Sequence, residues 1–394
     1  FVLRGNKYYL NDSIYFPLYE GKSFMQYDHR FAHVVISQTA LSRPAQPKEL
    51  TLTEHLSSDV SPIARAWIDR KEILNWCKNK GYSKQWLLVY KKITSATNER
   101  TLISAFLPLI ACVDTIHIIV LEQKISSIFA SILNGNLNSI VLDYVVRQKL
   151  GGTAINFYIL NQLPIIPKQQ YKNDDIEYIV PRVLELSYSA WDIQSFADNL
   201  WQEASPEMRN TFVNQWEENA IATGGGHHDV KRPSWGEEST DGFPYPPFKW
   251  NDERRAVLRA ELDAYYAKLY GLNRDELRYI LDPQDVYGSD FPGETFRVLK
   301  EKELKLFGEY RTRRLVLDAW DRLEGVEVGN PDGYPTQGAA VTPNQETISA
   351  ALPRSESRPV AVQTQLPATA KPPLPVTPPS KVVKEIDPPA GQPT

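Results

Sequence analysis

The sequence is poor in cysteine, because Cys77 and Cys112 are the only two among 394 residues. Two cysteines are too few for a disulfide framework or a four-cysteine zinc site, and such scarcity is typical of a reducing compartment. Long apolar runs are also missing, since none approaches the roughly 18 to 20 residues that span a bilayer. No charged segment followed by an apolar one opens the chain. We therefore expect a cytoplasmic protein with no membrane partner.

Motifs for catalysis and for metal binding are absent too. In proteins that bind phosphate through a glycine-rich loop, that loop lies between a strand and a helix. The three glycines at 224–226 instead follow a helical segment, so they indicate a linker. His29 and His33 have the spacing of two metal ligands on a helix, but no third ligand follows at a suitable distance. Neither cysteine lies in a recognisable nucleophile context. We expect no catalytic residue, no metal and no bound cofactor in this chain.

Charge is spread unevenly along a chain whose formal net charge is −4. Residues 61–172 contain fourteen Lys and Arg against six Asp and Glu. A basic segment within an acidic protein suggests a surface that faces phosphate, although an uneven scatter of surface lysines gives the same count. The composition therefore permits a local nucleic-acid site and argues against a uniformly basic binder.

The hydrophobic pattern predicts an α+β fold, because helical and strand periods occur without regular alternation. Two apolar runs, WLLVYKKIT (86–94) and TLISAFLPLI (101–110), flank the polar stretch SATNER and predict a hairpin with a polar tip. Other expected elements are short strands in 5–36, a loop in 37–60, a helix or two in 61–80 capped by Ser61 and stopped by Gly81, a helix in 121–134 that ends at Asn134 and Gly135, a further helix closing at Gly151, and a strand in 153–167.

Composition divides the chain into three regions. Residues 1–172 mix helices and strands, and residues 173–328 are predicted to be helical with a flexible, glycine-rich insert near 222–242. Residues 329–394 are rich in Pro, Ala, Thr and Val and contain almost no aromatic residues. Such a composition cannot bury a core, so we expect a disordered Pro-rich tail.

Several stretches, in order and spacing, resemble the specificity half of large adenine-specific DNA methyltransferases of restriction-modification and phage-defence systems (type IIG, BREX-like or DISARM-like). The resemblance covers most of residues 10–170 and much of 180–320. It rests on FPLYEGKSFMQYDHRFA (16–32), KKITSATNERTLISAFLP (91–108), NSIVLDYVVRQKLGGTAINFYILNQLPIIP (138–167), YPPFKWNDERRAVLRAELDAYYAKLYGL (245–272) and FGEYRTRRLVLDAW (307–320).

The resemblance implies that residues 1–172 are a TaqI-like DNA target-recognition domain that follows a methyltransferase domain. The family's catalytic motif, Asn, Asp or Ser before Pro-Pro-aromatic, is missing, because Tyr245 has the wrong chemistry and the Pro-Pro after Asp387 precedes Ala390. The family's cofactor, S-adenosyl-L-methionine, is therefore expected in a catalytic domain upstream of this chain. Since the chain opens on Phe1, we interpret it as part of a longer polypeptide or as a processed or split piece.

The partners that the resemblance implies are double-stranded DNA, a methyltransferase domain in cis or as a separate subunit, and other defence-system proteins. Residues that contact DNA in such a region are basic or amide side chains. The candidates here are Lys22, Arg30, Lys91, Lys92, Thr97, Asn98, Arg100, Arg147 and Lys149.

Each candidate has a structural alternative. The hairpin tip also fits a solvated loop, and Arg147 and Lys149 also fit favourable charges at a helix C-terminus. An internal hydrogen-bonded network at a domain junction is the alternative for Tyr19, Tyr27, Asp28 and Arg30. For the whole chain, the alternatives are a stand-alone, non-catalytic specificity or scaffold subunit of a defence complex, and a protein-interaction module that recruits a partner through its Pro-rich tail.

Overall fold

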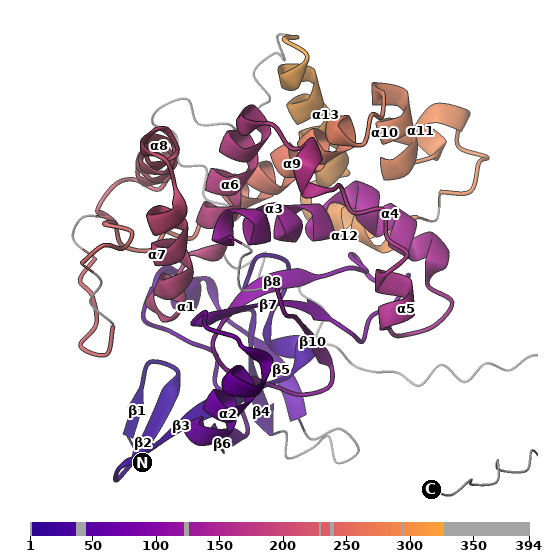
Figure 1. Ribbon diagram of the computed structural model, residues 1–394. Helices are drawn as coiled ribbons and strands as arrows, with labels where there is room; N and C mark the ends of the chain where they lie inside the picture. The colour runs from indigo at the N-terminus through magenta and orange to yellow at the C-terminus, as the bar shows by residue number, and fades with distance from the viewer. Residues whose placement is uncertain are drawn as a thin grey trace, which may run out of the picture. The chain divides into compact units, whose positions relative to one another are not determined.

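The computed structural model in Figure 1 describes residues 2–36, 45–121, 126–227, 230–236, 240–293 and 295–326. All of these lie within one compact unit, Phe1–Thr342. None of the helices in the described ranges is long and apolar enough to cross a membrane. The tail expected at 329–394 lies outside the described residues, as do 228–229 and 237–239 of the expected insert.

Three small sheets make up the β part of the described ranges. The order β1-β2-β3-β6 forms the first sheet, with β9 parallel to β3, and β4 pairs with β5 in the second. The third sheet has the antiparallel order β10-β7-β8. The strands are β1 (Val2–Arg4), β2 (Lys7–Leu10), β3 (Ser13–Tyr19), β4 (Ala32–Ile36), β5 (Ala45–Glu49), β6 (Trp67–Asp69), β7 (Trp86–Lys91), β8 (Ser104–Pro108), β9 (Ala111–Cys112) and β10 (Ile116–Ile119).

From residue 126 onward the described chain is helical, and the mixed α+β class is confirmed. Figure 1 shows these helices on one side of the β7–β8 hairpin and the N-terminal strands on its other side. The helices are α1 (Leu52–Leu56), α2 (Arg70–Lys80), α3 (Ser127–Asn138), α4 (Ile140–Lys149), α5 (Phe157–Leu160), α6 (Asn173–Ser187), α7 (Gln194–Glu203), α8 (Pro206–Ala222), α9 (Asp252–Leu269), α10 (Arg274–Leu281), α11 (Gln284–Tyr287), α12 (Arg297–Phe307) and α13 (Arg311–Leu323).

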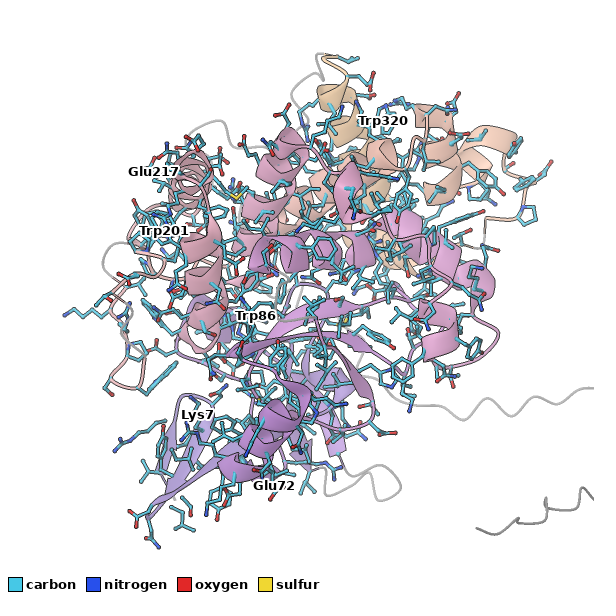
Figure 2. All side chains as sticks on the ribbon, in the orientation of Figure 1. Lys7, Glu72, Trp86, Trp201, Glu217 and Trp320 are labelled. Carbon is cyan, nitrogen blue, oxygen red and sulfur yellow. The ribbon has the colours of Figure 1, made fainter. Side chains whose placement is uncertain are left out.

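Strand β7 is buried on both faces, which explains its continuous apolar sequence. Because strand side chains alternate, Trp86 and Leu88 face the helices, whereas Leu87 and Val89 face the core shared with β3. Trp86, labelled in Figure 2, lies beside Phe196 of α7, with 5.5 Å between the ring centroids. The predicted hairpin is confirmed, and the helices share a core with it.

Four local predictions are wrong in instructive ways. The predicted loop 37–60 contains β5 and α1, and α2 is capped by Asp69 rather than Ser61. Helix α3 continues through Gly135, and residues 153–167 contain the helix α5 in place of a strand. Gly81 does end α2, in a left-handed conformation that suits glycine.

Gly135 is a position of close packing rather than a stop signal. A Cβ atom there would lie 2.8 Å from the Tyr266 hydroxyl of α9. That hydroxyl donates a hydrogen bond to the carbonyl of Ile132, one turn earlier in α3, at 2.7 Å. The glycine therefore lets α9 approach α3, which the sequence pattern alone did not reveal.

Candidate nucleic-acid interface

The polar loop 92–103 connects β7 to β8 and is fixed to α4 by one buried carboxylate. Asp143 of α4 is fully buried, and its Oδ1 accepts the backbone N–H groups of Thr101 and Leu102 at 2.9 and 2.8 Å. Within the loop, the hydroxyl of Thr94 donates to the carbonyl of Thr101 at 2.7 Å. The base of the loop is therefore rigid, and its conformation is set from the protein side.

Arg147 of α4 holds the tip of this loop. Its guanidinium donates to the carbonyls of Ala96, Asn98 and Glu99 at 2.8, 2.8 and 2.9 Å. It also contacts Asp143 at 3.3 Å, and only 4 % of its side chain is exposed. Burial lowers the pKa of Arg147 from its ordinary value. A guanidinium satisfied in this way does not reach a phosphate, so the structure gives Arg147 a clamping role.

Arg100 is also turned inward. Its Nη2 donates to Asp263 of α9 at 2.7 Å, and both side chains are largely buried. The other carboxylate oxygen of Asp263 accepts the backbone N–H of Ile140 at 2.7 Å. Burial lowers the pKa of Arg100, but the Asp263 carboxylate more than offsets this and raises it above its ordinary value. The pair therefore ties the loop to α9 and to the start of α4.

Lys91 is the third basic candidate that lies inside. Its ammonium contacts the Met25 sulfur at 3.0 Å and lies over the rings of Phe24 and Phe31. Burial lowers the pKa of Lys91 to about 8. A desolvated lysine among aromatic rings is a poor phosphate ligand in this conformation.

Arg30, in the N-terminal patch, is fully buried. Its guanidinium donates to main-chain carbonyls of four residues within 3.1 Å, namely Ser57, Val60, His55 and Ser189. Beside it, Asp28 meets His55 at 3.4 Å and His29 meets Asp192 at 2.8 Å. The interpretation as an internal network therefore fits Asp28 and Arg30, whereas the buried Tyr19 hydroxyl has no hydrogen-bond partner among the described residues. A phosphate contact by Arg30 does not fit the structure.

Four candidates remain at the surface near the loop: Lys92, Thr97, Asn98 and Lys149. Thr97 and Asn98 are exposed at the loop tip, and Lys149 is exposed at the end of α4. Lys92 is partly exposed and forms a 3.5 Å ion pair with Asp114, which is itself largely exposed. We call these four residues the outer set.

Lys22 lies elsewhere in the N-terminal patch. Its ammonium donates to the carbonyl of Ala45 at 2.6 Å and pairs with Glu20 at 3.1 Å. Glu20 is also bound by Arg65, whose Nε lies 2.5 Å from it. Gly21 next to Lys22 donates its N–H to the Thr115 hydroxyl at 3.0 Å, so this patch abuts the turn before β10.

Sequence reasoning missed a feature beside the loop. Phe157 and Tyr158 of α5 are 63 % and 64 % exposed. Their segment is joined to the loop by hydrogen bonds from Thr94 N–H to the Thr153 carbonyl at 3.0 Å and from Ile155 N–H to the Lys92 carbonyl at 2.8 Å. The two adjacent aromatic residues that follow the Gly-Gly pair could have indicated an exposed aromatic surface. The predicted strand in 153–167 gave them no role.

The two histidines with metal-ligand spacing do not converge. His29 bonds Asp192 and His33 bonds Glu54, at 2.8 and 3.1 Å. In the part of the chain that the structure describes, no three His, Cys, Asp or Glu side chains form a group that could hold a metal ion. His227 of the predicted insert is 1 % exposed and lies 2.6 Å from the Asn219 amide oxygen, so it is packed rather than poised as a ligand.

Comparison with known proteins leaves the candidate interface to be judged on its own chemistry. No protein-family model, no curated protein and no solved structure matches the chain.

Proposed function

We propose that this chain is the DNA recognition portion of a site-specific adenine-N6 DNA methyltransferase in a restriction-modification or phage-defence system. The observation that carries the proposal is the loop 92–103, which Arg147 holds from inside while Lys92, Thr97 and Asn98 face outward. The sequence resemblance supplies the reaction, the S-adenosyl-L-methionine cofactor and the catalytic domain upstream of this chain. The cytoplasm is the expected location.

The chemistry of adenine methylation explains the need for such a region. The target base must leave the duplex, at a cost of a few kcal/mol. A second domain must therefore hold the duplex through its phosphates and choose the site at the base edges. In the outer set, Lys92, Lys149 and Thr97 suit phosphate oxygens, and the Asn98 amide suits an adenine edge in the major groove.

In this proposal, the buried arginines hold the loop 92–103 in place and do not contact DNA themselves. Arg147 donates to three main-chain carbonyls of the loop tip as well as to Asp143 and the Thr295 carbonyl, and Arg100 is paired with Asp263. They present the outer set in one conformation before DNA arrives, so that less ordering entropy is lost on binding.

The direct test is DNA binding by the full chain, measured by fluorescence anisotropy with a labelled duplex over a series of KCl concentrations. Replacing Lys92 and Lys149 together by Ala should weaken binding and flatten the plot of log K against log salt by about 0.9 per lost phosphate contact. The matched control is Lys78→Ala, an exposed lysine of α2. Equal slopes for all three proteins would reject the outer set as the phosphate-binding surface.

The base-reading role is tested separately. Selection of bound duplexes from a randomised pool gives the preferred site of the unmodified chain. Asn98→Ala should relax the preference at one position by about 1–3 kcal/mol while leaving the salt slope unchanged. An unchanged preference would remove Asn98 from base readout.

The catalytic part of the proposal needs different evidence. The genomic DNA immediately upstream of the Phe1 codon should encode a glycine-rich loop and an Asn-Pro-Pro-aromatic motif, in frame or in a neighbouring gene. The absence of any methyltransferase there would leave DNA binding without the proposed reaction.

A further inference from the structure

An aromatic platform lies beside Lys92 of the outer set. Phe157 of α5 stacks on His117 of β10, with 4.7 Å between the ring centroids and 16° between the planes. The Phe157 side chain is nevertheless 63 % exposed, so the imidazole covers one face of the ring and leaves much of the rest to solvent. Figure 1 shows α5 beside α4 at the end of the β7–β8–β10 sheet.

The support beneath Phe157 is fixed from the core. Tyr90 of β7 is 1 % exposed, and its hydroxyl lies 2.6 Å from His117 Nδ1. Burial raises the pKa of Tyr90 to about 12, so the phenol keeps its proton while it shares a hydrogen bond with Nδ1. Burial and the nearby charge of Lys92 lower the pKa of His117, which favours a neutral imidazole. The stack is therefore held before any ligand binds.

Lys92 and its ion-pair partner Asp114 lie near the platform. Lys92 is close enough to His117 to lower its pKa, and its carbonyl accepts the N–H of Ile155, two residues before Phe157. Lys149 ends α4 on the opposite side of the Gly-Gly turn that leads to α5. Asp114, whose side chain is 85 % exposed, pairs with Lys92 at 3.5 Å and offsets part of its charge. A flat apolar group attached to phosphates complements this arrangement.

We propose that Phe157, supported by His117 and flanked by Lys92 and Lys149, is a stacking platform for a nucleobase that has left the DNA duplex. The inference rests on the proposed function and deepens it, because it names the part of the DNA that this surface receives. Every base has a face that stacks on an aromatic ring, so the contact does not depend on sequence. A methyltransferase of this class displaces one base from the stack, and the platform holds the disrupted strand while Lys92 and Lys149 contact its phosphates.

The test compares two duplexes, one fully paired and one with a single unpaired 2-aminopurine, binding to the full chain. Phe157→Leu keeps an apolar side chain and removes the ring. It should weaken binding of the unpaired duplex about tenfold, in the range of one lost base–aromatic stack. It should leave the paired duplex and the salt slope unchanged. Quenching of 2-aminopurine fluorescence by the wild-type chain should be lost in this variant and restored in Phe157→Trp.

A matched control separates stacking from general effects of an exposed aromatic. Tyr287→Leu alters a side chain that is 64 % exposed at the end of α11, which is also a four-residue helix. It should bind both duplexes as the wild type does. Thermal unfolding of Phe157→Leu should match the wild type, since the side chain is mostly exposed.

The outcomes distinguish this inference from the function on which it rests. If the duplexes bind and the Lys92 and Lys149 variants change the salt slope, but Phe157→Leu binds the unpaired duplex normally, the platform is rejected and the proposed function stands. The patch would then suit a protein partner instead. If the wild-type chain binds neither duplex, both proposals are rejected.

Discussion

The guanidinium of Arg147 illustrates how a residue type suited to phosphate serves the protein interior. Removing it would leave the Asp143 carboxylate buried without its partner and several loop carbonyls without a donor. Breaking a buried pair from one side costs about 3–5 kcal/mol. We therefore expect Arg147→Ala to lower the free energy of unfolding by this amount, measured by urea denaturation.

The control for Arg147 is Arg297→Ala, because Arg297 is half exposed and forms an i,i+4 pair with Glu301. Such surface pairs contribute about 0.3–0.5 kcal/mol. A stable Arg147→Ala protein that had lost only its affinity for DNA would contradict the clamping role and restore a direct phosphate contact.

Lys91 gives stability a pH dependence that can be measured. Its pKa is lowered from 10.5 to about 8 in the folded protein, because burial disfavours the charged form. The unfolded chain binds the proton more tightly, so the charged lysine destabilises the fold below pH 8 and this penalty is lifted as the pH rises toward 10.5.

Lys91→Met should therefore be more stable than the wild type at pH 7, and its advantage should shrink between pH 8 and pH 10.5. Urea denaturation across this range provides the measurement, with Lys78→Met as the exposed control. An advantage that stays constant with pH would mean that the gain comes from packing rather than from charge.

At the scale of single elements, the α3–α9 contact depends on one missing side chain. Gly135→Ala gains helix propensity of about 1 kcal/mol but forces a methyl group to 2.8 Å from the Tyr266 hydroxyl. Overpacking of this kind costs about 1–3 kcal/mol, so we expect a net loss of stability. Calorimetry should show a lower melting temperature.

Gly151→Ala is the control at this scale, because nothing lies within 4 Å of an added Cβ there. It should be neutral or slightly stabilising. A stabilised Gly135→Ala protein would show that α9 can move away from α3 without cost.

The sequence pattern predicted elements whose signal was local and continuous. The β7–β8 hairpin was predictable because both strands are mostly apolar, and Gly81 marked the end of α2. The sequence pattern did not predict α5, because only Ile159 of this helix is buried and the helix is too short to show a hydrophobic period. Nor did it separate Arg147 from Lys149, since the direction of a basic side chain depends on partners distant in sequence, such as the carbonyls of the 92–103 loop.

At the scale of the whole described region, we expect the β10-β7-β8 sheet and the helices to unfold together. Phe106 of β8 and Phe196 of α7 stack with ring centroids 3.9 Å apart, and Trp86 donates to Asn199 of α7 at 3.0 Å. These contacts join residues on either side of the predicted domain boundary between residues 172 and 173. The boundary stays a prediction. Truncating a buried phenylalanine costs about 3–5 kcal/mol.

Phe196→Ala should therefore shift the unfolding transitions seen by tryptophan fluorescence and by far-UV circular dichroism by the same amount. Phe157→Ala, which removes an exposed ring, should shift neither by a comparable amount. Two separate transitions, with only one moved by Phe196→Ala, would show that the helical region and the sheet are independent folding units.

The way in which the loop 92–103 is held has a consequence for its evolution. Arg147 holds it through the carbonyls of Ala96, Asn98 and Glu99, and a carbonyl is the same in every amino acid. Substitutions at the exposed tip therefore alter what the loop presents without altering how it is held. Under the proposed function, new binding preferences can arise there by single mutations, while the residues that support the loop stay as they are.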